Sequence, residues 1–281
     1  MLALCGLLCT GFGCDSNTQL LPHINGSSAP SLPPGLDSSM VAQLTGRFES
    51  DNFVFHFQPD DTVWVDRQEA LHRWAVEYLD IRLPKKIDYY KFSFADMRTA
   101  VGTRGASGRG FPRHSALATI YNWHPHETMH IYTFAICQNI TIRLYDEGMA
   151  VAHEIDPLNN DLVPRWVQWP GRGRYVYAEK VREHRAAGKL YAIEDILDSR
   201  SFLQVRHDER GTVNNRVVYD QAGMFVSYLI NTFGIDKMKQ AICSVSNDDS
   251  RDTIIREFEK VFGITVQEAE RAWWAYLDSS M

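Results

Sequence analysis

The sequence contains few cysteines and no surplus of basic residues. Five of its 281 residues are cysteine, and 29 Lys and Arg residues are outnumbered by 35 Asp and Glu residues, which gives a formal net charge of −6. A nucleic-acid-binding protein needs a dense Lys and Arg surface to neutralise phosphates. The composition therefore argues against a nucleic-acid partner. The hydrophobic fraction of 44% is that of an ordinary globular protein.

A long hydrophobic run is also missing. The apolar stretch MLALCGLLCTGFG at the N-terminus is too short to cross a bilayer as a helix, and it lacks the basic start of a typical signal peptide. Small residues then precede Cys14, and residues 1–14 resemble the end of a bacterial lipoprotein signal. That resemblance implies export to the cell envelope, with lipidated Cys14 as a possible membrane tether or, without lipidation, secretion.

Only Cys137 and Cys243 lie outside that segment. The sequence leaves open whether they form a disulfide or remain two thiols, because it does not show that they meet. Residues 15–44 are rich in Ser, Pro, Gly and Asn and have no apolar period, so they predict an extended, mobile linker. No internal repeat is apparent in the chain.

The remaining chain, 45–281, predicts an α+β fold. Alternating or apolar stretches predict strands over 53–57, 86–94 and 116–123, and helical spacing from Leu71 to Leu79 predicts a helix between the first two. The glycine-rich stretch 102–112 predicts a flexible surface loop. Because strands precede helices instead of alternating with them, we expect a small mixed-sheet subdomain, 45–137, followed by a mainly helical subdomain, 138–281.

Several signals define the later helices. Gly234 and Gly263 each follow an apolar helical pattern and are predicted to end those helices. Thr265 and Glu268 have the spacing of a capping box ahead of the helix that contains Trp273 and Trp274.

The stretch WHPHETMHIY, 123–132, carries the strongest chemical signal. His126 and His130 are four positions apart, so a helix would place both imidazoles on one face, where they could bind the same ion. Glu127 would lie about 100° further round, where it could reach a metal-activated water without being a ligand. By chance alone, the HExxH pattern is expected in roughly one or two of a hundred chains of this length.

A zinc site of this type needs a third protein ligand. Metzincins place a histidine six residues after the second histidine, where this chain has Ile136, so that class is excluded. The stretch YDEGMAVAHE, 145–154, resembles the Glu-Gly-x-Ala helix that supplies a glutamate ligand in peptidase MA-like gluzincins. The resemblance implies Glu147 as the third ligand. Asp146 and His153 would face other sides of that helix, and His124, before Pro125, is expected outside the metal helix, at a strand end or behind the ligands.

The same resemblance extends over about residues 46–279, including YDQAGMFVSYLINTFGIDKM, 219–238, and the closing FGITVQEAERAWWAYL. It implies a zincin-like fold that binds one Zn²⁺ through His126, His130 and Glu147 and hydrolyses peptide or protein substrates. Glu127 would act as general base, and Tyr219 would donate to the tetrahedral oxyanion. We also expect that the strand at 116–122 could bind an extended peptide at its edge.

Two alternatives keep the same ligands. One is a non-catalytic binding protein with a gluzincin fold, and the other is a zinc hydrolase of non-peptide amides or esters. The sequence does not separate the second alternative from a peptidase, because the zinc chemistry is shared. The oligomeric state and the identity of the substrate also stay open.

Overall fold

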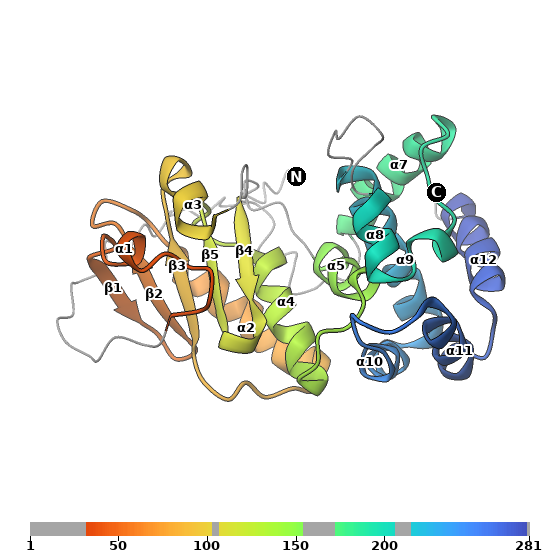
Figure 1. Cartoon of the computed structure of the whole chain (residues 1–281), viewed down its shortest axis with the longest axis horizontal. Helices are drawn as coiled ribbons and strands as arrows, with labels where there is room; N and C mark the ends of the chain where they lie inside the picture. Colours follow the sequence, from red (N-terminus) through yellow and green to blue (C-terminus); the bar gives the residue numbers. More distant parts are fainter. Residues whose placement is uncertain (1–31, 103–106, 154–171, 206–214, 280–281) are drawn as a thin grey trace, which may run out of the picture.

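The computed structural model describes residues 32–102, 107–153, 172–205 and 215–279. A five-stranded sheet with flanking helices forms the N-terminal part, and a group of helices forms the C-terminal part (Figure 1). Helices α4 (Pro125–Cys137) and α5 (Arg143–Ala152) lie where the two parts meet. The predicted α+β organisation is confirmed. None of the helices described is both long and apolar enough to cross a bilayer.

The sheet is mixed. Its order is β1-β2-β3-β5-β4, in which β2, β3 and β5 are parallel and the two edge strands run antiparallel to their neighbours. The strands are β1 (Gly46–Glu49), β2 (Phe53–Phe57), β3 (Ile87–Lys91), β4 (Gly108–Phe111) and β5 (Ala116–Thr119). The strands predicted at 53–57, 86–94 and 116–123 are thus confirmed, although β5 is four residues shorter than predicted.

The prediction of a loop over 102–112 is wrong for 108–111, which form the edge strand β4 (residues 103–106 lie outside the described part). Glycine usually destabilises a strand. In β4, however, Gly108 and Gly110 let the strand lie close to α4. A Cβ on Gly108 would lie 2.0 Å from the His124 ring, far inside van der Waals contact. Because β4 covers β5, the prediction of peptide pairing at the edge of 116–122 is also wrong.

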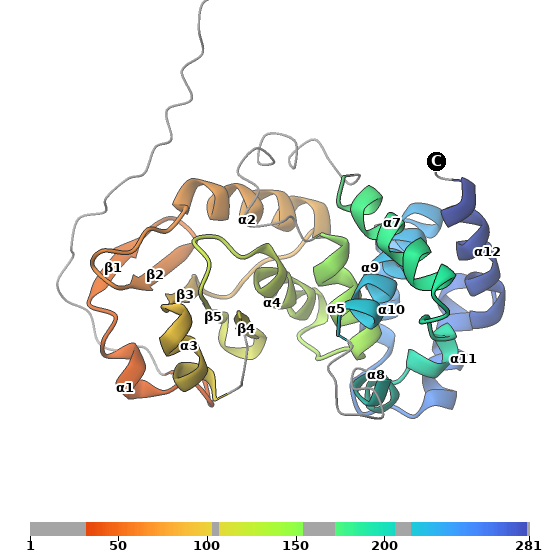
Figure 2. The same ribbon diagram turned by 90° about the horizontal axis from the view of Figure 1, so that it is seen from above.

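Helices cover both faces of the sheet (Figure 2). Helix α2 (Val65–Leu79) and α4 pack on one face in the main apolar core, and α1 (Ser38–Val41) and α3 (Phe94–Val101) pack on the other in a second core. A sheet covered on both faces should have buried residues on both sides of its central strands. Strand β3 meets that expectation, since all five of its residues are buried.

The linker predicted over 15–44 is wrong for residues 32–44, which belong to the fold. Asp37 caps α1 through hydrogen bonds from the backbone N–H groups of Ser39 and Met40. Leu36, Met40 and Leu44 are buried in the second core. This segment is rich in Pro and Ser, but three apolar side chains at four-residue spacing are enough to pack it against the core. Residues 15–31, like 1–14 with Cys14, lie outside the described part.

Glu69 on α2 holds the β1–β2 turn. Its carboxylate accepts hydrogen bonds from Ser50 Oγ at 2.5 Å, Asn52 N at 2.9 Å and Asn52 Nδ2 at 2.7 Å. Burial alone would raise the pKa of Glu69, but these hydrogen bonds outweigh it and lower the pKa below 4.5. The ionised carboxylate is therefore the form that stabilises the fold.

Glu69→Gln is expected to lower the free energy of unfolding by about 1–3 kcal/mol near pH 7. Because the folded pKa is depressed, the wild-type advantage is complete above about pH 4.5 and is lost as the pH falls through the folded pKa. Urea unfolding of the wild type and of Glu69→Gln, repeated from neutral to acidic pH, measures this difference in the free energy of unfolding. Glu77→Gln, on the exposed side of the same helix, is the control, and an equal loss in both variants would contradict the role of Glu69.

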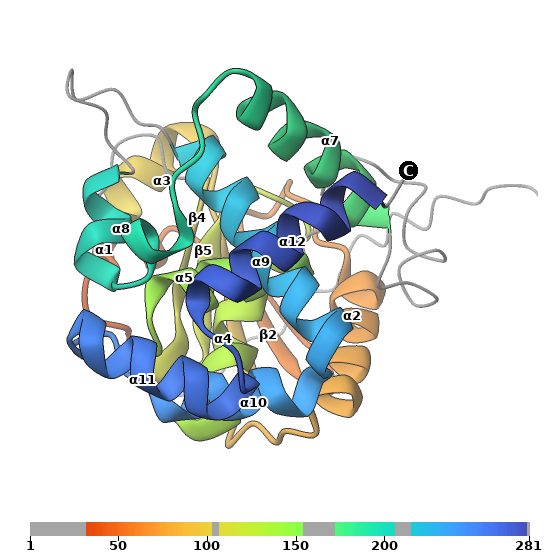
Figure 3. The ribbon, with the colours of Figure 1, turned by 90° about the vertical axis from the view of Figure 1, so that its right-hand side faces the viewer.

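Helix α9 (Asn215–Phe233) is the centre of the C-terminal part (Figure 3). It packs against α5 and three other helices. The C-terminal helices around it are α7 (Arg172–Ala186), α8 (Ser199–Val205), α10 (Ile235–Ser244), α11 (Arg251–Phe262) and α12 (Val266–Ser279). Two short 3-10 helices, η1 (Pro112–His114) and η3 (Ile193–Ile196), complete the described elements.

The predicted helix ends in this part are confirmed. Gly234 follows α9 with φ +88°, and Gly263 ends α11 with φ +74°, a region that glycine enters without steric cost. The capping box is present as well. Thr265 N donates to Glu268 Oε2 at 2.8 Å, and Glu268 N donates to Thr265 Oγ1 at 3.2 Å.

Candidate metal centre

Helix α4 begins where the sequence predicts it. Pro125 occupies the first helical position. An N–H at that position has no partner within the helix, so a proline there costs no hydrogen bond. His126 and His130 therefore lie one turn apart on the same face, with ring centroids 5.0 Å apart. His124 is the residue before the helix, as predicted. Its carbonyl accepts a hydrogen bond from Thr128 Oγ1 at 2.7 Å, which holds the first turn.

Helix α5 brings the third candidate ligand to this face. Gln138, with φ +55°, ends α4, and only a short connection separates it from α5. Gly148, directly after Glu147, lets α5 pack closely on α9, because a Cβ there would lie 2.4 Å from Val226 Cγ2 and 2.9 Å from the Ala222 carbonyl oxygen. The close packing places Tyr219 of α9 next to Glu147.

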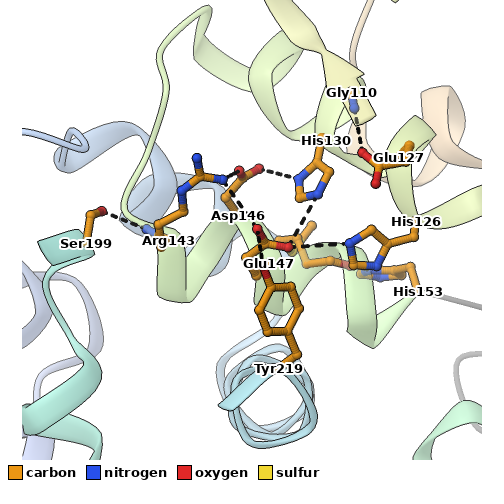
Figure 4. Close-up of polar contacts among 11 residues, drawn as sticks. Gly110, His126, Glu127, His130, Arg143, Asp146, Glu147, His153, Ser199 and Tyr219 are labelled. Atoms are coloured by element: carbon orange, nitrogen blue, oxygen red, sulfur yellow. Dashed lines mark hydrogen bonds and ion pairs between the residues drawn. The ribbon is translucent and has the colours of Figure 1, made fainter. Parts of the chain in front are cut away.

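The three predicted ligands converge (Figure 4). Nε2 of His126 and Nε2 of His130 each lie 3.4 Å from Oε2 of Glu147. One ligand atom from each residue lies within 4.8 Å of the other two, so this group could hold a metal ion. His130 and Glu147 are buried, and His126 is partly exposed.

The two carboxylate oxygens of Glu147 have different surroundings. Oε1 accepts hydrogen bonds from the Tyr219 hydroxyl at 3.1 Å and from Arg143 Nη1 at 3.3 Å. Oε2 is buried, and within the described part of the chain it accepts no hydrogen bond of standard geometry. A buried carboxylate oxygen without a donor is costly. Oε1 is thus satisfied by the protein, while Oε2 faces only the two imidazoles.

Two of the three separations between candidate ligand atoms are those of a tetrahedral metal site. Tetrahedral zinc with bonds of about 2.0–2.2 Å separates its ligand atoms by about 3.3–3.6 Å. The two separations of 3.4 Å fall within that range, whereas direct charge-assisted hydrogen bonds would be about 2.7–2.9 Å. The donor set of two imidazoles and one carboxylate is also one that zinc uses in catalytic sites, with one position left open.

Electrostatics at the site favour a bound cation. Burial would lower the pKa of His130, but the negative charges of Asp146 and Glu147 raise it well above 6.5. Burial would likewise raise the pKa of Glu147, yet His130 and His126 hold it well below 4.5. The carboxylates therefore stabilise positive charge at the imidazoles, and a metal ion can supply that charge in place of a proton.

Asp146 has a role that the sequence prediction missed. Its Oδ1 lies 2.8 Å from Nδ1 of His130, on the opposite side of the ring from Glu147. Adjacent residues on a helix point about 100° apart, so the sequence predicts that Asp146 does not bind the same ion as Glu147. The two nitrogens of one imidazole also point in different directions, so neighbouring carboxylates can contact one each. Such a contact fixes the tautomer and orientation of a metal-binding histidine.

Asp146→Asn is expected to weaken zinc binding about 10–100-fold while leaving the fold intact. The amide keeps the shape of the side chain but loses the charge that orients His130 and increases its basicity. Competition with a chromophoric chelator measures the affinity. Asp236→Asn, at a side chain that is 87% exposed on α10, is the control, and wild-type affinity in Asp146→Asn would refute this role.

Glu127 does not belong to the ligand group. Its Oε2 accepts a hydrogen bond from the backbone N–H of Gly110 in β4, with N and O 2.5 Å apart. Gly110 also lies close to the α4 backbone, because a Cβ there would be 3.2 Å from the Glu127 carbonyl oxygen. The edge strand thus orients the predicted base. The loop predicted for this glycine-rich stretch does not include the contact, although glycines in a strand are a signal of close backbone approach.

Tyr219 lies at the site, as the resemblance implies. Its ring is roughly parallel to that of His126, with an interplanar angle of 23° and centroids 6.4 Å apart, and its hydroxyl donates to Glu147. That hydrogen bond orients the carboxylate. Donation to an oxyanion stays a prediction.

His153 is not in the ligand group. Its Nδ1 lies 2.8 Å from the Met149 carbonyl oxygen, and its ring packs against Trp74 and Tyr78. The prediction that His153 is not a ligand agrees with this position.

The family models, the curated proteins and the solved structures contain no match to this chain.

Proposed function

We propose that this protein is a zinc-dependent hydrolase of gluzincin type that cleaves peptide bonds. The observation that carries the proposal is the buried Oε2 of Glu147, which faces the Nε2 atoms of His126 and His130 at tetrahedral-edge distances. A purely structural ion cluster would satisfy that oxygen with short hydrogen bonds. The HExxH pattern on α4 then supplies a glutamate next to the ligands.

The residues at the site have different roles in this proposal. A zinc ion bound by His126, His130 and Glu147 would polarise the scissile carbonyl and lower the pKa of a water molecule. Glu127 accepts a proton from the attacking water and passes it to the leaving amine. Gly110 holds Glu127 through its N–H, and Tyr219 is the candidate oxyanion donor. Arg143 and Tyr219 both position Oε1 of Glu147.

The sheet suggests how an extended substrate would lie. Strand β4 is the terminal strand of the described sheet and packs beside α4. A peptide that adds to a sheet edge forms main-chain hydrogen bonds along it. We therefore assign peptide pairing to β4 in place of β5, through main-chain groups other than the Gly110 N–H, which already donates to Glu127. The lipoprotein-like segment at 1–14 supports export, with Cys14 as a membrane tether, as a further part of the proposal.

The test combines metal analysis with a mixed peptide library. We expect about one zinc ion per chain and cleavage that stops after chelation and returns with zinc. Bound zinc without cleavage, beside a working control protease, would favour the non-catalytic binding protein. Turnover of small activated esters with no peptide cleavage would instead favour a hydrolase of non-peptide substrates. A chain that binds no zinc would refute all three.

A further inference from the structure

The C-terminal ends of α4 and α10 lie side by side, and each end carries a cysteine. Cys137 is the last residue of α4, and Cys243 is in the last turn of α10. Figure 1 shows the two helices next to each other at the junction of the sheet and the helical part. The segments that follow the two cysteines are therefore close in space although they are distant in the sequence.

Two hydrogen bonds join those segments directly after the cysteines. Asn139 Nδ2 donates to the Val245 carbonyl oxygen at 3.2 Å, and Asn247 N donates to the Ile140 carbonyl oxygen at 2.9 Å. Asn139 and Val245 each follow their cysteine by two positions. The two chain segments thus run alongside each other directly after the two cysteines, which brings Cys137 and Cys243 near one another.

The two thiols are free and near one another. Both cysteines are unpaired, Cys137 is half-buried and Cys243 is exposed. The two thiols are near enough to interact, because Cys137 contributes to the raised pKa of the Cys243 thiol. An oxidant in solution can reach the Cys243 side of the pair.

We propose that Cys137 and Cys243 form a reversible disulfide that ties the end of α4 to α10. A small disulfide compound, or a disulfide-bearing oxidoreductase, is the oxidant. The Cys243 thiolate attacks it and forms a mixed disulfide, which releases one thiol. The Cys137 thiolate then attacks the Cys243 sulfur and releases a second thiol. Two protein thiols are oxidised, one external disulfide is reduced, and the two protons leave on the released thiols.

The environment of Cys243 determines the rate of this reaction. Partial burial and the nearby Cys137 raise the pKa of the Cys243 thiol to about 12. The reactive thiolate is consequently scarce at neutral pH, and oxidation by a small disulfide should be slow without a catalyst. The disulfide would close a loop of about 100 residues, a length at which a cross-link restricts the unfolded chain strongly. It would also join α4, which carries the candidate ligands, to the helical part.

The experiment uses the full chain with Cys5→Ser, Cys9→Ser and Cys14→Ser, so that only the proposed pair remains. After reduction, the protein is incubated with oxidised glutathione and a catalytic disulfide oxidoreductase, blocked with N-ethylmaleimide, digested without reductant and analysed by mass spectrometry. We expect one linked peptide that contains Cys137 and Cys243, and a melting temperature roughly 5–15 °C above that of the reduced protein. Dithiothreitol should reverse both changes.

Cys137→Ser and Cys243→Ser in the same background are the matched controls, and neither should gain thermal stability from the oxidant. Recovery of both cysteines as maleimide or glutathione adducts would overturn the proposal. A melting temperature that rises equally in a single-cysteine variant would overturn it as well. The same oxidation is repeated on the chain with all five cysteines. The proposal would also be overturned if Cys137 or Cys243 were then linked to Cys5, Cys9 or Cys14 and not to each other.

Discussion

Glu127→Gln is expected to keep about one zinc ion per chain and to lose peptide hydrolysis by about 10²–10⁴-fold in kcat. The three candidate ligand atoms come from His126, His130 and Glu147, so the substitution leaves the ligand group untouched. A glutamine amide cannot accept and return a proton at neutral pH, but its oxygen can still accept the hydrogen bond from Gly110. Zinc content and the rate of peptide cleavage, measured on the same preparation, give the two results.

The matched control for this substitution is Glu259→Gln. Glu259 is exposed on α11 and is not in the ligand group, so the same change of charge occurs outside the site. It should leave both zinc content and cleavage unchanged. Full activity in Glu127→Gln would remove Glu127 as the base, whereas loss of zinc in that variant would show that the carboxylate belongs to the metal site.

Local patterns in the sequence predicted much of the fold because each depends on neighbouring residues. The Phe53–Phe57 alternation, the glycines at 234 and 263 and the Thr265–Glu268 box all correspond to local geometry in the structure. The failures involve contacts between distant segments. Strand β4 is stable because β5 pairs with it and α4 packs beside it, and residues 32–44 are ordered because Leu36 and Met40 reach a core built largely by later residues.

At the candidate site, too, the sequence predicts what depends on neighbouring residues and does not predict contacts between distant segments. The spacing of His126 and His130 follows from helical geometry, and family resemblance pointed to Glu147; the structure brings all three together. The groups that orient His130 and Glu127 do not follow from the sequence. Asp146 contacts a second nitrogen of an imidazole whose ring orientation is set by tertiary packing, and Gly110 reaches Glu127 from another element. Such contacts leave no periodic pattern in a single sequence.

His126→Ala and Glu147→Ala are each expected to reduce zinc content from about one ion per chain to near zero after dialysis against a chelator. Either change leaves two protein ligands, too few for the closed side of a catalytic zinc site. The loss of affinity should therefore exceed the roughly 10–100-fold effect expected for Asp146→Asn. Peptide cleavage should fall to background in both variants, because Glu127 then has no activated water from which to accept a proton.

The control must separate loss of ligands from loss of fold. Glu147→Ala leaves Arg143 and the Tyr219 hydroxyl without their shared acceptor, so circular dichroism and thermal melting should accompany the metal analysis. His56→Ala removes an imidazole on β2 that contacts Asp88 and is not in the ligand group, and it should retain zinc and activity. If a folded Glu147→Ala protein kept its zinc, the third ligand would have to be another residue. Zinc retained in both ligand variants would mean that the ion binds elsewhere, and the proposed hydrolase would then lack its metal centre.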